Sequence, residues 1–157
     1  MPGNLPARYV AVIGGGEAEP EAAALAYEVG RELARRGAVV VCGGLGGVMA
    51  AVARGVLEEG GVSIGILPDP DRRRADPHLT YSIPTNLGHA RNMIIAHAAD
   101  AVIAVGGSYG TISEAAIALK LGKPVIGLKL AWTLKGVQAA ASPAEAVAAA
   151  VGGGLEI

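Results

Sequence analysis

The residue types with the clearest capacity for chemistry lie at residues 106–114. This stretch reads Gly-Gly-Ser-Tyr-Gly-Thr-Ile-Ser-Glu. A glycine-rich turn that leads into a helix presents backbone N–H groups to an anion, most often a phosphate, and leaves room where a Cβ would clash. Glu114 adds a fixed carboxylate beside that position. The spacing therefore predicts a phosphate pocket at residues 107–111 with an acid next to it, and a phosphorylated small molecule as the ligand.

The elements that would position this pocket follow from the hydrophobic pattern. Residues 101–105 form a short apolar run typical of a strand buried on both faces of a parallel sheet, and apolar residues recur at helical spacing after Thr111. Similar strand patterns occur at residues 9–13, 38–42, 62–67, 81–83, 124–128 and 137–140. Helical patterns alternate with them at residues 20–36, 48–59, 88–98 and 143–151. This alternation predicts an α/β protein with a doubly wound, mostly parallel sheet of six to seven strands and helices on both faces.

Glycine turns follow the predicted strands at residues 14–16, 43–47 and 106–110. Right-handed crossovers place every strand-to-helix turn at the same edge of a parallel sheet. We therefore expect these turns and residues 88–91 to meet along one crevice. The long loop at residues 69–78 contains three consecutive arginines, and we expect it to be a solvated, mobile loop, with closure over a phosphate as the alternative.

Two apolar stretches predict a subunit interface. The helix at residues 48–59 is apolar nearly all round, and residues 93–95 read Met-Ile-Ile. An apolar helix of this kind needs cover on a second face, and exposed apolar patches favour association. We expect a partner subunit to supply that cover, so the protein should be a homodimer or a higher homo-oligomer.

Composition restricts the class of protein. A chain of 157 residues is most simply one domain, spanning residues 1–157. A formal net charge of −1 gives no electrostatic footprint for nucleic acid or an anionic membrane, and no apolar run is long enough to span a bilayer. The single cysteine, Cys42, excludes an internal disulfide and is expected to be a buried apolar residue. The three histidines lack metal-ligand spacing. We therefore expect a soluble, cytoplasmic protein without a metal site.

Two familiar nucleotide motifs fit poorly. A dinucleotide-binding turn needs a third small residue, but Glu19 occupies that position after Gly14 and Gly16. The second strand also ends in Cys42, where the ribose-binding acid belongs. A P-loop fits still less well, because Lys123 is followed by proline instead of serine or threonine and nothing in front of it fits.

Four further motifs lie in order along the chain: Gly-Gly-Leu-Gly-Gly-Val-Met at 43–49, Gly-Ile-Leu-Pro at 65–68, His-Ala-Arg-Asn at 89–92 and Gly-Ser-Tyr-Gly-Thr-Ile-Ser-Glu at 107–114. Together they resemble the LOG, or "Lonely Guy", family of phosphoribohydrolases, long mislabelled lysine decarboxylases. The resemblance covers roughly residues 9–128. It implies a Rossmann-like fold, a dimer and no metal or organic cofactor. It also implies cleavage of the N-glycosidic bond of AMP-type or cytokinin-riboside-type 5′-monophosphates, which releases the base and ribose 5-phosphate.

The resemblance assigns roles by position. It makes Glu114 and Arg91 the catalytic residues. The substrate- or phosphate-binding residues that follow from the matched motifs are Gly43, Gly44, Asn92, Gly107, Ser108, Tyr109, Gly110 and Thr111. Breaking a ribosyl C–N bond develops positive charge on the sugar, which a carboxylate such as Glu114 stabilises, while Arg91 holds the phosphate or assists departure of the base. The alternative is a purely structural role, in which Thr111-x-x-Glu114 is only a capping box at the start of a helix.

Departures from the family pattern leave a second function open. Gly106 replaces a proline, Ser108 a glycine, Ala90 a glutamate, Asn92 a lysine and Cys42 a glycine. These changes indicate a divergent bacterial-type branch whose members resemble molybdenum-cofactor carrier proteins. The leading interpretation is therefore a nucleoside 5′-monophosphate phosphoribohydrolase, and not a lysine decarboxylase. The alternative is a non-catalytic nucleotide or molybdenum-cofactor binding protein with the same pocket.

Overall fold

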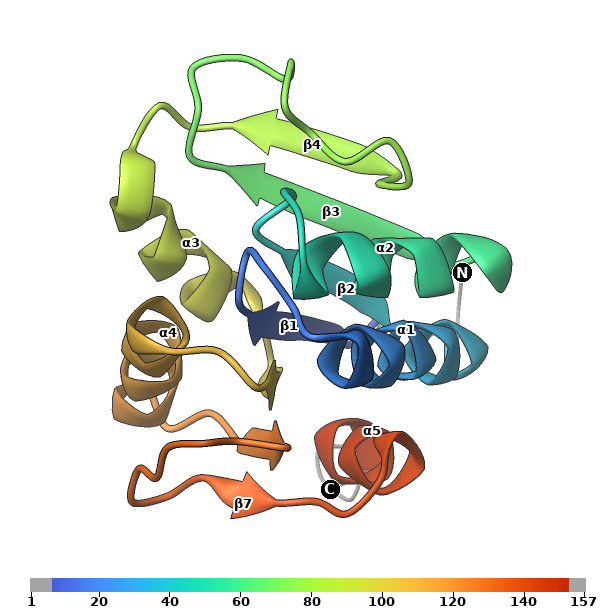
Figure 1. Cartoon of the computed structure of the whole chain (residues 1–157), viewed down its shortest axis with the longest axis vertical. Coiled ribbons are helices and arrows are strands. Elements are labelled where there is room, and N and C mark those ends of the chain that lie inside the picture. The colour runs from blue at the N-terminus through green and yellow to red at the C-terminus, as the bar shows by residue number, and fades with distance from the viewer. Residues whose placement is uncertain (1–6, 153–157) are drawn as a thin grey trace, which may run out of the picture.

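A seven-stranded parallel sheet forms the centre of the computed structural model, which describes residues 7–152 (Figure 1). The strand order is β4-β3-β2-β1-β5-β6-β7, and each neighbouring pair runs parallel. The strands are β1 (Tyr9–Gly14), β2 (Val39–Cys42), β3 (Val62–Leu67), β4 (Tyr81–Pro84), β5 (Ala101–Val105), β6 (Val125–Leu128) and β7 (Gln138–Ala139). The predicted class is confirmed, with the strand count at the upper end of the expected range.

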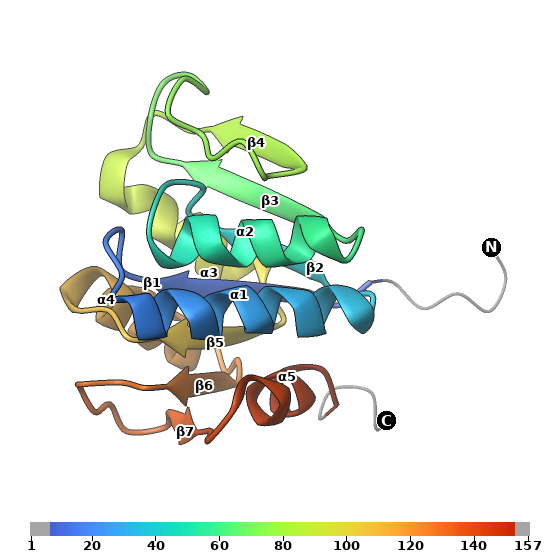
Figure 2. The same cartoon turned by 45° about the vertical axis from the view of Figure 1, so that its right-hand side comes forward.

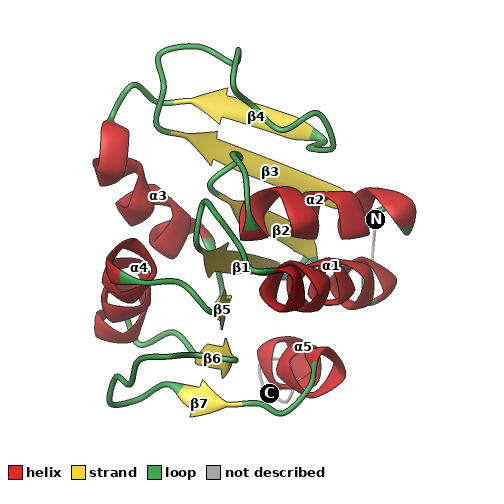
Figure 3. Cartoon of the chain, viewed as in Figure 1, coloured by secondary structure: helices red, strands yellow, loops and turns green. Residues whose placement is uncertain are grey.

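Helices cover both faces of the sheet (Figures 1 and 2). One face carries α1 (Pro20–Arg35), α2 (Val48–Glu58) and α5 (Pro143–Gly152), and the other carries α3 (Arg91–Ala98) and α4 (Tyr109–Lys120). A short 3₁₀ turn, Gly88–Ala90, precedes α3 (Figure 3). None of the helices within residues 7–152 is long and apolar enough to cross a membrane.

The core consists of two layers of small aliphatic side chains, one on each face of the sheet. Successive residues of a strand point to opposite faces, so Val10 and Val12 of β1 pack with the α1, α2 and α5 layer. Ala11 and Ile13 pack with the α3 and α4 layer. All four are at most 2% exposed. Both layers hold β1 and β5 at the centre of the sheet, and the carboxyl ends of these two strands carry the candidate site.

Helix α2 has its second face covered by α1 of the same chain. The two backbones approach so closely that a Cβ at Gly55 would lie 2.1 Å from the carbonyl oxygen of Tyr27. The buried residues of α2 face both the sheet and this neighbour. The expectation that a partner subunit covers this helix is therefore wrong. Hydrophobic periodicity indicates that a face is buried, but it does not identify the covering element.

The arginine-containing loop at residues 69–78 is fixed to its surroundings. Arg74 makes a two-pronged ion pair with Asp69, with N···O distances of 2.8 and 2.7 Å. The backbone N–H of Asp76 donates to the carbonyl oxygen of Gly44 over 2.9 Å. The loop was expected to be free in solvent, and these contacts give it a defined path beside the turn after β2.

Candidate functional site

The candidate site lies where the direction of chain winding reverses. From β1 the chain moves outward through β2 and β3 to β4, and then returns to place β5 on the other side of β1. In open α/β sheets, ligands bind in the crevice outside the carboxyl ends of the strands at such a switch point. The turn after β1 and the turn after β5 therefore flank the position where a ligand is expected.

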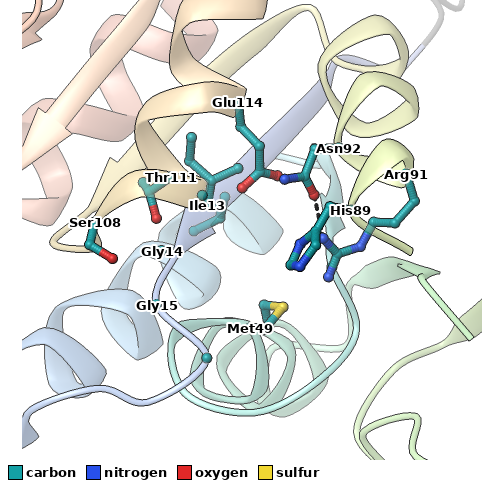
Figure 4. Close-up of a pocket in the computed structure, with 14 residues that line it drawn as sticks. Ile13, Gly14, Gly15, Met49, His89, Arg91, Asn92, Ser108, Thr111 and Glu114 are labelled. Carbon is teal, nitrogen blue, oxygen red and sulfur yellow. Dashed lines mark hydrogen bonds between the residues drawn. The ribbon is translucent and has the colours of Figure 1, made fainter. Parts of the chain in front are cut away.

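A cavity of about 210 Å³ occupies this position (Figure 4). Figure 4 shows the side chains of Glu114 and Thr111 from α4, and of Asn92 and Arg91 from α3, reaching toward the same hollow beside the turn after β1. The cavity is lined by Val12, Ile13, Gly14, Gly15, Gly16, Gly43, Met49, His89, Arg91, Asn92, Ser108, Gly110, Thr111 and Glu114.

The turn after β5 delivers the N-terminus of α4 to the cavity. Gly107 has φ +85°, and a Cβ there would lie 2.1 Å from Oγ1 of Thr111, so only glycine allows the helix to begin this close to the turn. The first N–H groups of a helix have no intrahelical acceptor and form its positive end. The first turn of α4 therefore lies at the cavity, where the sequence predicts an anion at residues 107–111.

The capping-box interpretation of Glu114 is wrong. Helix α4 begins at Tyr109 with Ser108 as its N-cap residue, so Thr111 is already the third helical residue. A capping box needs the hydroxyl residue at the N-cap and the glutamate three positions later. Glu114 instead lies in the second turn of α4, with its side chain at the cavity.

Burial changes the acidity of Glu114. Its exposed fraction is 8%. Removal from water disfavours the charged form and raises the pKa of the carboxyl to about 7, although the positive charge of Arg91 acts in the opposite direction. The carboxyl is therefore about half protonated near neutral pH, which lets it act as a hydrogen-bond donor or as an anion.

Arg91 is buried and held in a fixed direction. Its Nε donates to the carbonyl oxygen of Ile66 over 2.9 Å, and its Nη1 donates to Oδ1 of Asn92. The guanidinium lies so close to Gly43 that a Cβ at that position would be 2.7 Å from Nη2. Burial lowers the pKa of Arg91, opposed most strongly by Glu114, yet arginine remains cationic in proteins. The site therefore holds a positioned cation close to a titrating acid.

A second cavity of about 350 Å³ adjoins the first and shares Arg91 and His89 with it. Its other lining residues are Leu45, Pro68, Asp69, Arg74 and Gly88. These residues come from the turn after β2, the end of β3, the arginine-containing loop and the 3₁₀ turn before α3. Arg91 and His89 therefore lie at the boundary between two neighbouring cavities.

The family model of the SLOG cluster4 family matches residues 7–151. The chain belongs to this family. Its sequence is 47% identical over 138 residues to an uncharacterized protein of Archaeoglobus fulgidus, a match that covers 88% of this chain and 91% of the relative.

Solved structures resemble this SLOG cluster4 protein over most of their length. The molybdenum cofactor binding protein of the phototrophic bacterium Rippkaea orientalis is 36% identical, with a TM-score of 0.85 over 89% of this chain and 93% of that one. The molybdenum cofactor carrier protein of Chlamydomonas reinhardtii is 33% identical, with a TM-score of 0.85 over 92% and 96%. These matches confirm the predicted LOG-like family, close to the molybdenum-cofactor carrier proteins.

Most of the predicted site residues of this SLOG cluster4 protein meet at the first cavity. Those that line it are Gly43, Arg91, Asn92, Ser108, Gly110, Thr111 and Glu114. Gly107 shapes the turn and lines a neighbouring cavity of about 220 Å³. Gly44 does not line the first cavity and instead binds the loop at Asp76. The side chain of Tyr109 is 89% exposed and also lies outside the cavity, so only its backbone belongs to the site.

Met49 and His89 are among the lining residues that sequence reasoning did not assign to the site. Met49 belongs to the 43–49 motif, but nothing in a run of apolar residues distinguishes the one that faces a ligand pocket. His89 lacks metal-ligand spacing and was not assigned to the site, whereas it is exposed and lines both cavities. Its place in the 89–92 motif beside Arg91 was the available signal.

Cys42 does not contribute a reactive thiol to the site. Cys42 is fully buried, and burial raises the pKa of its thiol to about 12, so it is not a nucleophile. Within residues 7–152, no group of three or more histidine, cysteine, aspartate or glutamate side chains is arranged to hold a metal ion.

Proposed function

We propose that this protein binds the molybdenum cofactor, a phosphorylated pterin, as cargo at the α4 N-terminus and carries it without turnover. The observation that carries the proposal is the cavity formed by the first turn of α4, the fixed guanidinium of Arg91 and the buried carboxyl of Glu114. The family membership and the two solved relatives named for this cofactor support the choice of ligand.

The charge state of the site suits the binding of an anion. A phosphate at residues 109–111 would accept hydrogen bonds from the backbone N–H groups at the positive end of α4. Glu114 can remain protonated beside such an anion, because its pKa is already about 7 and a nearby negative charge raises the pKa of a carboxyl further. A protonated carboxyl donates a hydrogen bond to the ligand, but it cannot stabilise a cationic sugar.

A nucleoside 5′-monophosphate phosphoribohydrolase is the second candidate. The observation in its favour is that Arg91 and Glu114 line the same cavity, as the resemblance to the LOG family implies for the catalytic pair. Above neutral pH, the ionised carboxylate would stabilise the positive charge that develops on the ribose as the base departs. In this role of electrostatic stabiliser Glu114 must be ionised, whereas the carrier function has no such requirement.

One experiment separates the two functions. The purified protein is mixed anaerobically with molybdenum cofactor released from a molybdoenzyme and passed over a gel-filtration column. We expect molybdenum and pterin fluorescence to elute with the protein in near-stoichiometric amounts. Arg91→Gln should reduce this retention strongly, and the exposed control Arg36→Gln should not. Passage of all the cofactor to the small-molecule fraction would refute the carrier function.

The same preparation is incubated with AMP, and ribose 5-phosphate is measured. We expect none above the protein-free blank. Stoichiometric or greater release of ribose 5-phosphate from AMP, abolished in Glu114→Gln, would establish the hydrolase instead.

We further propose that the protein is a cytoplasmic homodimer that binds small molecules and not nucleic acid. The support for a dimer is now confined to α3, where Met93 and Ile94 are exposed while Ile95 is buried in the core. Sedimentation should give a dimer for the parent and a monomer for Ile94→Glu. A monomeric parent at micromolar concentration would refute the assembly. The net charge of −1 supports the exclusion of nucleic acid.

A further inference from the structure

The second cavity contains a carboxylate that already binds a planar pair of N–H donors. Arg74 Nε donates to one carboxylate oxygen of Asp69 over 2.8 Å, and Arg74 Nη2 donates to the other over 2.7 Å. This two-pronged geometry requires two parallel N–H groups in one plane. Both residues line the cavity that adjoins the phosphate site.

Asp69 is fixed in place, whereas its partner lies at the surface. The segment that follows β3 is held by two backbone bonds: Asn86 N–H donates to the carbonyl oxygen of Asp69 over 2.9 Å, and Gly88 N–H donates to that of Pro68 over 3.1 Å. The side chain of Asp69 is 19% exposed and that of Arg74 is 66% exposed. The carboxylate therefore belongs to the built structure of the cavity, and the guanidinium that covers it is free to move away.

Guanine and pterin carry the same donor pair as the Arg74 guanidinium. In a 2-amino-4-oxopyrimidine ring, a ring N–H and an exocyclic amino group point in parallel along one edge and match both oxygens of a carboxylate. Hypoxanthine keeps the ring N–H but lacks the amino group, and adenine has neither donor in this arrangement. A fixed carboxylate consequently distinguishes these rings.

We propose that the cavity beside Arg91 holds the heterocycle of the ligand and that Asp69 binds its 2-amino-4-oxopyrimidine edge in place of the Arg74 guanidinium. The inference rests on the proposed function, in which the phosphate of the same ligand lies at the N-terminus of α4. It assigns Asp69 as the residue that selects pterin or guanine over adenine.

The surroundings of Asp69 fit a planar heterocycle. The cavity volume of about 350 Å³ lies within the range of small-molecule sites, roughly 300–1,000 Å³. Leu45 and His89 line it and offer an apolar and a planar surface for a ring. Arg91, shared by the two cavities, contributes a positive charge that helps to keep the pKa of Asp69 low after Arg74 has moved, so Asp69 remains an acceptor.

Release of Arg74 leaves its guanidinium hydrated, because this side chain is 66% exposed. Asp69 is only 19% exposed, so the ligand edge must replace both of the hydrogen bonds that Arg74 donates. A ligand edge enclosed in the cavity makes the same two bonds away from water, where they are stronger. Arg74 therefore acts as a removable cover on Asp69.

Equilibrium dissociation constants for GMP, IMP and AMP test the inference on the full chain. The three nucleotides share the phosphate and ribose, and GMP differs from IMP only by the 2-amino group. We expect GMP to bind tighter than IMP by on the order of tenfold to a hundredfold, the effect of one hydrogen bond to a charged acceptor. AMP should bind more weakly than IMP. Equal constants for GMP and IMP would overturn the inference.

Variants of the same loop assign the effect to Asp69. Asp69→Asn should bring the GMP and IMP constants to within about twofold of each other, since asparagine replaces one of the two acceptor oxygens with an NH₂ donor and cannot match two parallel N–H groups. Asp71→Asn is the matched control, because Asp71 lies in the same loop, pairs with the exposed Arg73 over 3.4 Å and does not line the cavity; it should keep the GMP preference. A GMP preference that survives in Asp69→Asn would contradict the proposal.

Arg74→Ala separates a removable cover from a purely structural ion pair. We expect this variant to bind GMP up to about fivefold more tightly, because the competitor for Asp69 is gone. A weaker affinity for GMP would indicate that the ion pair only builds the loop, and would refute the inference.

Retention of the molybdenum cofactor distinguishes this inference from the proposed function. Reduced retention by Asp69→Asn relative to Asp71→Asn supports pterin recognition, and a GMP preference without cofactor retention identifies guanine as the source of the recognised edge. Equal retention by both variants would overturn the inference and leave the carrier function standing. A parent chain that retains neither cofactor nor any nucleotide would overturn both.

Discussion

Replacing Glu114 by glutamine should stabilise the protein, and the gain should depend on pH. The pKa of this carboxyl is about 7 in the folded protein against 4.5 for a free glutamate. Each unit of difference corresponds to 1.36 kcal/mol, so the ionised carboxylate destabilises the fold by about 3 kcal/mol at high pH. Glutamine has nearly the same shape and no charge to desolvate, and it avoids this cost.

The direction of this pH dependence follows from the binding of a proton to Glu114 in the folded and unfolded states. Between pH 4.5 and about 7, the unfolded chain has lost the Glu114 proton while the folded chain still holds it, so the stability of the parent falls as the pH rises through this window. Below the window the carboxyl is protonated in both states, and above it the carboxyl is ionised in both. The advantage of Glu114→Gln should therefore grow from about 1 kcal/mol at pH 5 to about 3 kcal/mol at pH 8.5.

Denaturant unfolding of parent and variant at pH 5, 6, 7 and 8.5 measures this difference in the free energy of unfolding. In thermal unfolding at pH 8.5, the melting temperature of Glu114→Gln should lie roughly 6–12 °C above that of the parent. Glu28→Gln, which replaces an exposed carboxylate of α1, is the matched control and should show no such rise with pH. An advantage of Glu114→Gln that stays constant across the series, or that reverses at high pH, would refute the assignment of a desolvated carboxyl.

Further outcomes follow from the packing. Gly107→Ala should destabilise the fold by more than about 1 kcal/mol, because Gly107 has φ +85° and no space for a Cβ. Gly110→Ala should raise the free energy of unfolding by about 0.5–1 kcal/mol, measured by thermal unfolding, because this residue lies in the first turn of α4 with open space around it. Gly55→Ala should cost about 1–3 kcal/mol, measured by denaturant unfolding, because its Cβ would meet the backbone of α1; an unchanged midpoint would contradict the close helix contact. Cys42 should not react with a thiol reagent such as Ellman's reagent at pH 8 in native protein and should react fully in denaturant, and rapid native labelling would show that it is accessible.

Periodicity was sufficient to predict the order of elements. The apolar run of β5 is short and continuous because this strand is buried on both faces. The predicted bounds of β1, β3 and β5 agree with the structure to within a residue. The crossover rule then correctly placed the glycine turns at one edge of the sheet. The start of α4 was predicted two residues late because Tyr109 and Gly110 carry no apolar pattern and are not good helix formers.

The properties that sequence reasoning could not predict depend on which residues tertiary packing brings into contact. The cover of α2 by α1 depends on a close backbone contact at Gly55, and a glycine in a helical pattern has no unique meaning. The raised pKa of Glu114 depends on how deeply α4 packs beside α3. The pairing of Arg74 with Asp69 depends on the path of a loop without any period. In each case the residue type was visible in the sequence, but its environment is a product of tertiary packing.

The junction of β1 and β5 makes the candidate site depend on both halves of the chain. Asp100 accepts the backbone N–H of Tyr9 across 91 positions of chain, and it marks the point where the second half of the protein joins the first. A nascent chain that ends before β5 has the turns after β1 and β2, but it has none of α4 and so lacks Glu114 and the anion-binding helix end. Ligand can bind only after the two halves have come together, and each bound molecule then opposes their separation by mass action. Ligand binding at this site is therefore coupled to the joining of the two halves, and a chain that ends before β5 would lack α4 and its side of the site.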